Sequence, residues 1–153
     1  MIADLIALDR DGQPVLLVAV RARVLSPRSI EAIVARLKTA GTGLAFGMVA
    51  DFEAIRVFDL TAETPTPLLV LKTDDVLRHY DPEFLCPSSA SGARPVFHDY
   101  FETLVQAWLR DLAYHWKSEA PPGSEALASI GLLQRLEGGA TQSEVPLGVD
   151  ALH

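Results

Sequence analysis

The chain has little cysteine and no long apolar run, and these two absences narrow its class. It contains one cysteine, Cys86, in 153 residues, so no disulfide can form within the chain. No uninterrupted run of about 18 apolar residues is present, which argues against a membrane-spanning helix. The N-terminal residues place no basic segment before an apolar one, so no signal peptide is expected. These features predict a protein of the reducing cytoplasm with no membrane partner.

Basic charge is also scarce, because the chain carries a net charge of −7. The imbalance is uneven: residues 1–50 hold six basic and four acidic side chains, whereas residues 51–153 hold seven and sixteen. A net acidic protein attracts phosphate backbones only weakly. Any nucleic acid is therefore expected to bind the N-terminal part of the chain.

Several common catalytic patterns are missing. Glycines 41, 43 and 47 are not followed by the Lys-Ser/Thr pair of a phosphate-binding loop. Cys86 has no basic neighbour in the sequence and lies in a Pro/Ser-rich segment, which makes it a poor nucleophile. The four histidines are scattered, and only His98 has a ligand-like partner at helical spacing, Glu102. We expect that pair on a solvated helix face.

The strongest pattern present is the apolar run from Val15, which ends in Arg21 and Arg23. Branched aliphatic residues bounded by a turn predict a strand buried on both faces at the centre of a sheet. Asp11-Gly12 is typical of a tight hairpin, and residues 3–8 supply the preceding strand. This hairpin places Asp4 near the far end of the central strand, beside residues 19–21.

The remaining patterns predict a mixed α/β sheet with helices packed on it, in one domain over residues 1–139 and a polar C-terminal tail over residues 140–153. Alternating periodicity and turn residues indicate strands at 44–49, 54–60 and 68–71, with Pro65 and Pro67 marking a loop or edge before the last. Capping residues and helical periodicity indicate helices at 26–40, 73–80, 97–116 and 124–136. The 97–116 helix carries an aromatic and aliphatic stripe expected in the core.

The first two predicted strands resemble the PD-(D/E)XK nuclease superfamily, which has the restriction-endonuclease-like fold. More narrowly, they are similar to uncharacterised bacterial proteins related to the N-terminal domain of type I restriction enzyme R subunits. Those proteins carry Pro-Asp on a first strand, a hairpin such as Asp-Gly-Lys-Pro, and a strand reading Val-Glu-Val-Lys-Ala. The corresponding sequences here are ADLIAL at 3–8, DGQP at 11–14 and VAVRA at 18–22. The resemblance implies a mixed central sheet flanked by helices.

The resemblance also implies the chemistry of the site, from which this chain departs at two positions. In the family, aspartate and glutamate hold Mg²⁺ and a lysine positions the attacking water. Asp4 matches the aspartate, but Ala19 stands at the acidic position and Arg21 at the lysine. A methyl group cannot bind Mg²⁺, and arginine stays protonated at ordinary pH. We therefore expect a catalytically degenerate domain with no cofactor, acting as a nucleic-acid or protein binding module.

An alternative reading keeps activity. Some members of the superfamily carry the acidic residue on the neighbouring helix, where Glu31 lies here. Asp4 and Glu31 would then bind Mg²⁺, and with Arg21 they would form a divergent DNA endonuclease. The simpler explanation of Glu31 is an ordinary first-turn acid that favours the helix dipole. Asp51 and Glu53, in the predicted 51–53 link, are weaker candidates.

The only basic cluster could serve binding. Its members are Arg21, Arg23, Arg28, Arg36 and Lys38. These side chains could meet phosphates in one groove, or some could pair with nearby acids such as Asp4 and Glu31. The related proteins usually have a helix before the first strand, so an exposed sheet edge and a homodimer covering it are also predicted.

Overall fold

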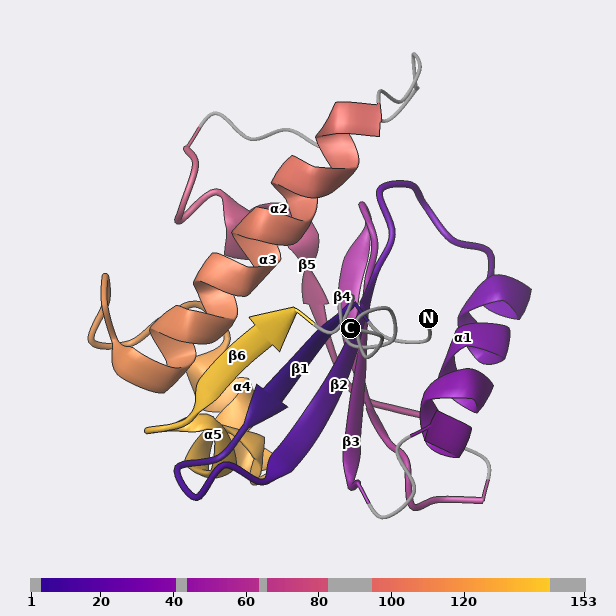
Figure 1. The fold of residues 1–153 in the computed structure, drawn as a ribbon. Helices are drawn as coiled ribbons and strands as arrows, with labels where there is room; N and C mark the ends of the chain where they lie inside the picture. The colour runs from indigo at the N-terminus through magenta and orange to yellow at the C-terminus, as the bar shows by residue number, and fades with distance from the viewer. Residues whose placement is uncertain (1–3, 41–43, 64–65, 83–94, 144–153) are drawn as a thin grey trace, which may run out of the picture.

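The protein is a mixed α/β structure built on one open sheet (Figure 1). The computed structural model describes residues 4–40, 44–63, 66–82 and 95–143. Six strands follow the order β5-β4-β3-β2-β1-β6, and helices cover both faces of the sheet. This confirms the predicted fold class. The strands are β1 (Leu5–Leu8), β2 (Pro14–Val20), β3 (Phe46–Ala50), β4 (Ala54–Asp59), β5 (Pro67–Lys72) and β6 (Ala140–Ser143).

The β1–β2 hairpin forms as its turn sequence predicts. Asp9 Oδ1 accepts hydrogen bonds from the backbone N–H groups of Asp11 (2.8 Å) and Gln13 (3.0 Å). Gly12 has a φ of 81°, a value that glycine adopts without strain. β2 pairs antiparallel with β1 and parallel with β3, and residues 15–20 are buried on both faces. The predicted central strand is thus confirmed.

Helix α1 (Pro27–Ala40) makes the crossover between the parallel strands β2 and β3. Ser26 Oγ accepts a hydrogen bond from the backbone N–H of Ser29 at 3.1 Å, which satisfies a free donor of the first turn. Ile33, Val34 and Leu37 face the sheet and are buried. The helix begins and ends as predicted, because its cap and its apolar stripe are local features.

The opposite face of the sheet is covered by α3 (Pro95–Tyr114), together with α2 (Thr73–Leu77), α4 (Ser124–Ser129) and α5 (Leu132–Leu136). Most of the predicted α3 stripe is buried: Phe101, Leu104, Val105, Trp108, Leu109 and Leu112. The stripe ends earlier than predicted. Trp116 lies beyond the helix and is 54% exposed, since the chain leaves the helical path at His115 (φ 57°).

The predicted single helix over 124–136 is two short helices, because Gly131 adopts a φ of 83° between them. The predicted polar tail also starts too early, since residues 140–143 form β6. β6 pairs antiparallel with β1 along its whole length. The edge beside β1, on which the homodimer prediction depended, is therefore covered by the chain itself.

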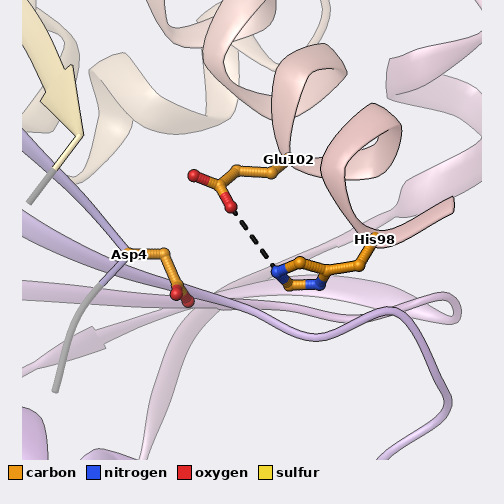
Figure 2. A group of neighbouring side chains, drawn as sticks. All are labelled: Asp4, His98 and Glu102. Atoms are coloured by element: carbon orange, nitrogen blue, oxygen red, sulfur yellow. Dashed lines mark ion pairs between the residues drawn. The ribbon is translucent and has the colours of Figure 1, made fainter. Parts of the chain in front are cut away.

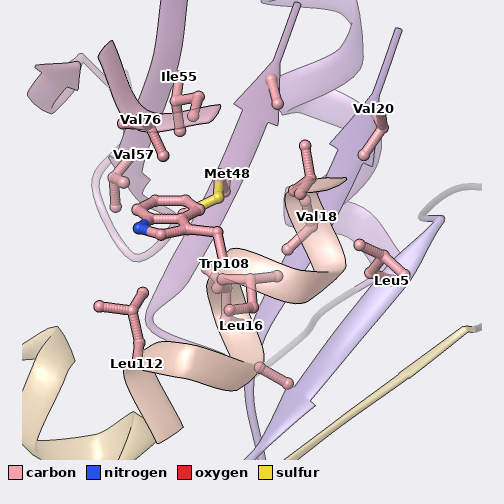
Figure 3. Packing of buried hydrophobic residues seen from close by; sticks show 14 of the residues in the cluster. Leu5, Leu16, Val18, Val20, Met48, Ile55, Val57, Val76, Trp108 and Leu112 are labelled. Atoms are coloured by element: carbon pink, nitrogen blue, oxygen red, sulfur yellow. The ribbon is translucent and has the colours of Figure 1, made fainter. Parts of the chain in front are cut away.

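The alternation of side chains along β2 creates two cores. Leu16, Val18 and Val20 face the cluster beneath α3, which also contains Trp108 (Figure 3). Leu17 and Ala19 face the smaller cluster beneath α1. Successive strand residues point to opposite faces, so neighbouring positions of one strand serve different layers. In the described residues, no helix has the length and apolar character needed to cross a membrane.

Candidate functional site

Asp4 and Arg21 meet at the end of the central strand, as the hairpin predicts. Arg21 Nη1 donates a hydrogen bond to Asp4 Oδ2 at 2.8 Å and another to the carbonyl of Val20 at 2.8 Å. The backbone N–H of Val20 donates to the same Asp4 oxygen at 2.7 Å. Two donors therefore hold Oδ2 of the Asp4 carboxylate in place.

His98 and Glu102, one turn apart near the N-terminal end of α3, complete a group with Asp4 (Figure 2). One ligand atom from each of the three residues lies within 4.8 Å of the others. His98 Nε2 is 3.5 Å from Glu102 Oε1. The helix face is only partly solvated, because the exposed fraction of the side chain is 38% for His98 and 20% for Glu102. The i,i+4 spacing indicates the His98–Glu102 pair, but it does not indicate Asp4, which lies just before β1.

The electrostatics of this group reflect two carboxylates held close together. Partial burial, and then the negative charge of Asp4, raise the pKa of Glu102 above its usual value, while His98 acts in the opposite direction. Arg21 compensates the charge of Asp4 directly, through an ion pair of 2.8 Å. Among the described residues, the ion-pair partner of Glu102 is the imidazole of His98, and no guanidinium group pairs with it. The group is thus better suited to a cation than to an anion.

The raised pKa of Glu102 has a consequence for stability. Between its ordinary value of 4.5 and the higher pKa of the folded state, the folded protein binds more protons than the unfolded chain. Stability is therefore expected to fall as pH rises through that window. Glu102→Gln removes this loss, so its unfolding free energy relative to the wild type should be higher at pH 7 than at pH 4. Urea unfolding of both proteins in metal-free buffer measures this, and the reverse order contradicts it.

The other motif residues are not gathered at this site. Ala19 is fully buried in the apolar cluster beneath α1, on the face of the sheet opposite α3. Glu31 is exposed on α1 and lines a pocket of about 370 Å³ with α1 residues, Phe58 and Glu63. It is not a member of the group that Asp4 forms with His98. The metal pair of Asp4 and Glu31 stays a prediction, and the described contacts of Asp4 are with Val20, Arg21 and the His98–Glu102 pair.

The basic cluster is divided by the fold. Arg21 is bound to Asp4, whereas Lys38 Nζ donates hydrogen bonds to the carbonyls of Ala62 and Glu63, in the turn after β4. Arg28 and Lys38 are ten positions apart on α1, a distance of roughly 15 Å along the helix axis. Arg23 and Arg28 are exposed, one in the β2–α1 loop and the other in the first turn of α1.

Asp51 stabilises two neighbouring loops through hydrogen bonds to their backbone. It is fully buried, and its two oxygens accept hydrogen bonds from the backbone N–H groups of Leu25, Glu53 and Ala54 at 2.8–2.9 Å. Glu53 is exposed and lies 3.7 Å from Arg56. These contacts join the β2–α1 loop to the β3–β4 turn. They give Asp51 a role in holding two loops together, which the sequence could not distinguish from a ligand role.

A second buried carboxylate, Asp111 on α3, binds the chain that follows the helix. Burial alone would raise the pKa of Asp111, but hydrogen bonds from the backbone of Lys117, the hydroxyl of Tyr80 and the backbone of Ser118 together lower it. Burial, and then the hydrogen bond that the Tyr80 hydroxyl donates to Asp111, raise the pKa of Tyr80. All three partner residues belong to the protein, so the arrangement fixes a loop. Cys86 and His153 lie outside the described residues.

The fold and the site together define a mixed α/β domain with a carboxylate–imidazole group at the end of its central hairpin. Comparison of the chain with protein-family models, curated proteins and solved structures finds no match. The functional argument therefore depends on the residues themselves.

Proposed function

We propose that this chain is a catalytically degenerate nuclease-like domain that acts as a binding module. One observation carries the proposal: Ala19, at the position where the resemblance implies an acidic metal ligand, is a fully buried apolar side chain beneath α1. The strand therefore presents no carboxylate there. Arg21, at the position of the lysine, is bound to Asp4 and to a backbone carbonyl. A group that cannot release its proton cannot relay one during hydrolysis.

Nucleic acid is the first partner to test, and Arg23 and Arg28 are the residues to change. Both are exposed and follow directly after the central strand, close in sequence to Arg21. Guanidinium groups bind phosphates bidentately and make such binding depend on salt. Lys38 is a weaker candidate than the sequence predicts, because its ammonium group already donates to two carbonyls.

The R23A/R28A double variant is expected to weaken binding of a labelled DNA or RNA duplex at least about tenfold at low salt, because two phosphate contacts are lost. Fluorescence anisotropy measures the affinity. R10A/R135A is the matched control, since it removes the same charge from exposed positions in the β1–β2 turn and on α5, both outside the basic cluster. Equal weakening in both variants would show only a net-charge effect. No binding by the wild type would turn the proposal toward a protein partner.

The alternative is an active Mg²⁺-dependent endonuclease using Asp4, Glu31 and Arg21. It requires cleavage of DNA by the unaltered protein with Mg²⁺ or Mn²⁺, and loss of that cleavage in Glu31→Ala. The position of Glu31 beside Phe58 and Glu63 gives no support to this reading. Cleavage that persists in Glu31→Ala but disappears in Asp4→Ala would instead indicate a different set of ligands.

Two further parts of the proposal concern the surroundings of the protein. The single cysteine supports a location in the reducing cytoplasm.

Association of two copies remains a prediction, and the sheet edge available to it is no longer that of β1. Strand β5 is the outermost strand on the far side of the sheet, and it exposes Leu68 (43%) and Val70 (55%).

A further inference from the structure

The Asp4–His98–Glu102 group combines one imidazole with two carboxylates at a half-buried position. Its members come from two segments more than 90 residues apart in the chain, and Figure 2 shows their side chains as neighbours, with Glu102 directed at His98. We propose that Asp4, His98 and Glu102 form a binding site for a divalent transition-metal ion of the Zn²⁺ or Mn²⁺ class. The inference goes beyond the proposed binding function and does not depend on it.

The donor set selects the class of metal. Imidazole nitrogen suits Zn²⁺ and other transition metals, whereas Mg²⁺ prefers oxygen ligands and keeps much of its water. One nitrogen and two carboxylate oxygens form a mixed set that leaves further coordination positions to water. This preference separates the site from the Mg²⁺ site that the resemblance implies, which would use oxygen ligands alone.

The spacing of the ligand atoms is close to what one ion requires. Ligand atoms bound to Zn²⁺ at about 2.0–2.2 Å lie within roughly 4 Å of one another. The three ligand atoms lie within 4.8 Å of one another, so side-chain movements of about 1 Å would bring them to the separation that one bound ion requires. His98 and Glu102 are four residues apart on α3, and this spacing places both on one face of the helix.

Asp4 accepts hydrogen bonds of the kind that orient the ligands of metal ions in proteins. The Val20 backbone N–H and the Arg21 guanidinium both bind Asp4 Oδ2, which fixes the carboxylate plane. Arg21 neutralises one of the two carboxylates, and the second remains without a cation in the described ion pairs apart from His98. A divalent ion would supply the missing positive charge and would tie α3 to the β1–β2 hairpin.

The test is a calorimetric titration of ZnCl₂, MnCl₂ and MgCl₂ into metal-free protein that carries no histidine tag. We expect saturable binding of one Zn²⁺ or Mn²⁺ per chain and much weaker binding of Mg²⁺. His98→Asn and Glu102→Gln should each weaken Zn²⁺ binding at least about tenfold, because each removes a ligand. Both residues are partly exposed, so both variants are expected to fold, which circular dichroism checks.

The chain offers a matched control in His115 and Glu137. Their side chains form the same kind of pair, with Nε2 and Oε2 separated by 3.5 Å, and they belong to no three-residue ligand group in the described part of the chain. H115N/E137Q should keep the wild-type affinity for Zn²⁺. As a second readout, ZnCl₂ should raise the Tm of the wild type and of the control, but not that of Glu102→Gln.

Three outcomes would overturn the inference. They are absence of saturable Zn²⁺ and Mn²⁺ binding, unchanged affinity in both His98→Asn and Glu102→Gln, or Mg²⁺ binding as tight as that of Zn²⁺. None of these concerns nucleic acid, so failure here leaves the proposed function standing. Conversely, a protein that binds no nucleic acid can still bind the metal.

Discussion

Asp51→Ala is expected to lower the free energy of unfolding by roughly 3–5 kcal/mol, because it leaves several buried groups without partners. The Asp51 side chain is fully buried and accepts three backbone hydrogen bonds, from Leu25 through Oδ2 and from Glu53 and Ala54 through Oδ1. Arg56 Nη1 lies 3.6 Å from Oδ1 and would lose its nearest acidic group there. Urea unfolding followed by circular dichroism measures the change.

The variant Asp51→Asn, which has nearly the same shape as the wild type, tests whether the lost acceptor causes this effect. Asp51→Asn retains one oxygen, but its amide N–H₂ group must face either the Leu25 donor or the donors of Glu53 and Ala54. Two donors then oppose each other in a buried position, so the loss of stability should approach that of Asp51→Ala.

Asp9→Ala is the matched control for both Asp51 variants. It also removes an acceptor of two backbone N–H groups, but at an exposed turn where water replaces it. That control should cost about 1 kcal/mol or less. If Asp51→Ala costs no more than Asp9→Ala, the structural role assigned to Asp51 is wrong.

The second large effect is expected at Trp108, the largest fully buried side chain. Trp108 lies among Met48, Val57 and Leu112 in the core beneath α3 (Figure 3), and its Nε1 donates to the carbonyl of Pro122 at 2.8 Å. Trp108→Ala should cost roughly 3–5 kcal/mol, since it leaves a cavity and removes a hydrogen bond. Trp108→Phe should cost less, because a ring still fills most of the space.

The other tryptophan provides the control for this series. Trp116 is 54% exposed, although its Nε1 donates to the carbonyl of Ala107 at 2.9 Å. Trp116→Ala should therefore cost about 1 kcal/mol. Guanidinium unfolding followed by far-ultraviolet circular dichroism avoids the change in fluorophore. Equal losses for Trp108→Ala and Trp116→Ala would contradict the placement of Trp108 at the centre of the core.

Much of the fold follows from local patterns in the sequence. The Asp11-Gly12 turn, the Ser26 cap and the apolar run of β2 each act over a few residues, so their elements occur where predicted. The meeting of Asp4 with Arg21 was also predictable, because a tight hairpin determines which residues of its two strands lie opposite each other. The breaks at Gly131 and His115 were missed, because helical periodicity continues across both positions.

The sequence by itself therefore determined the hairpin, the central strand, the first helix and half of the candidate site. Only the tertiary structure decided that His98 and Glu102 face Asp4, that Ala19 lies beneath α1, and that residues 140–143 cover β1. The physical reason is distance along the chain. Periodicity shows that a helix has an apolar face, but how the helix is rotated and where it lies on the sheet depend on all the side chains packed between them. A site shared by a hairpin and a distant helix exists only after that packing.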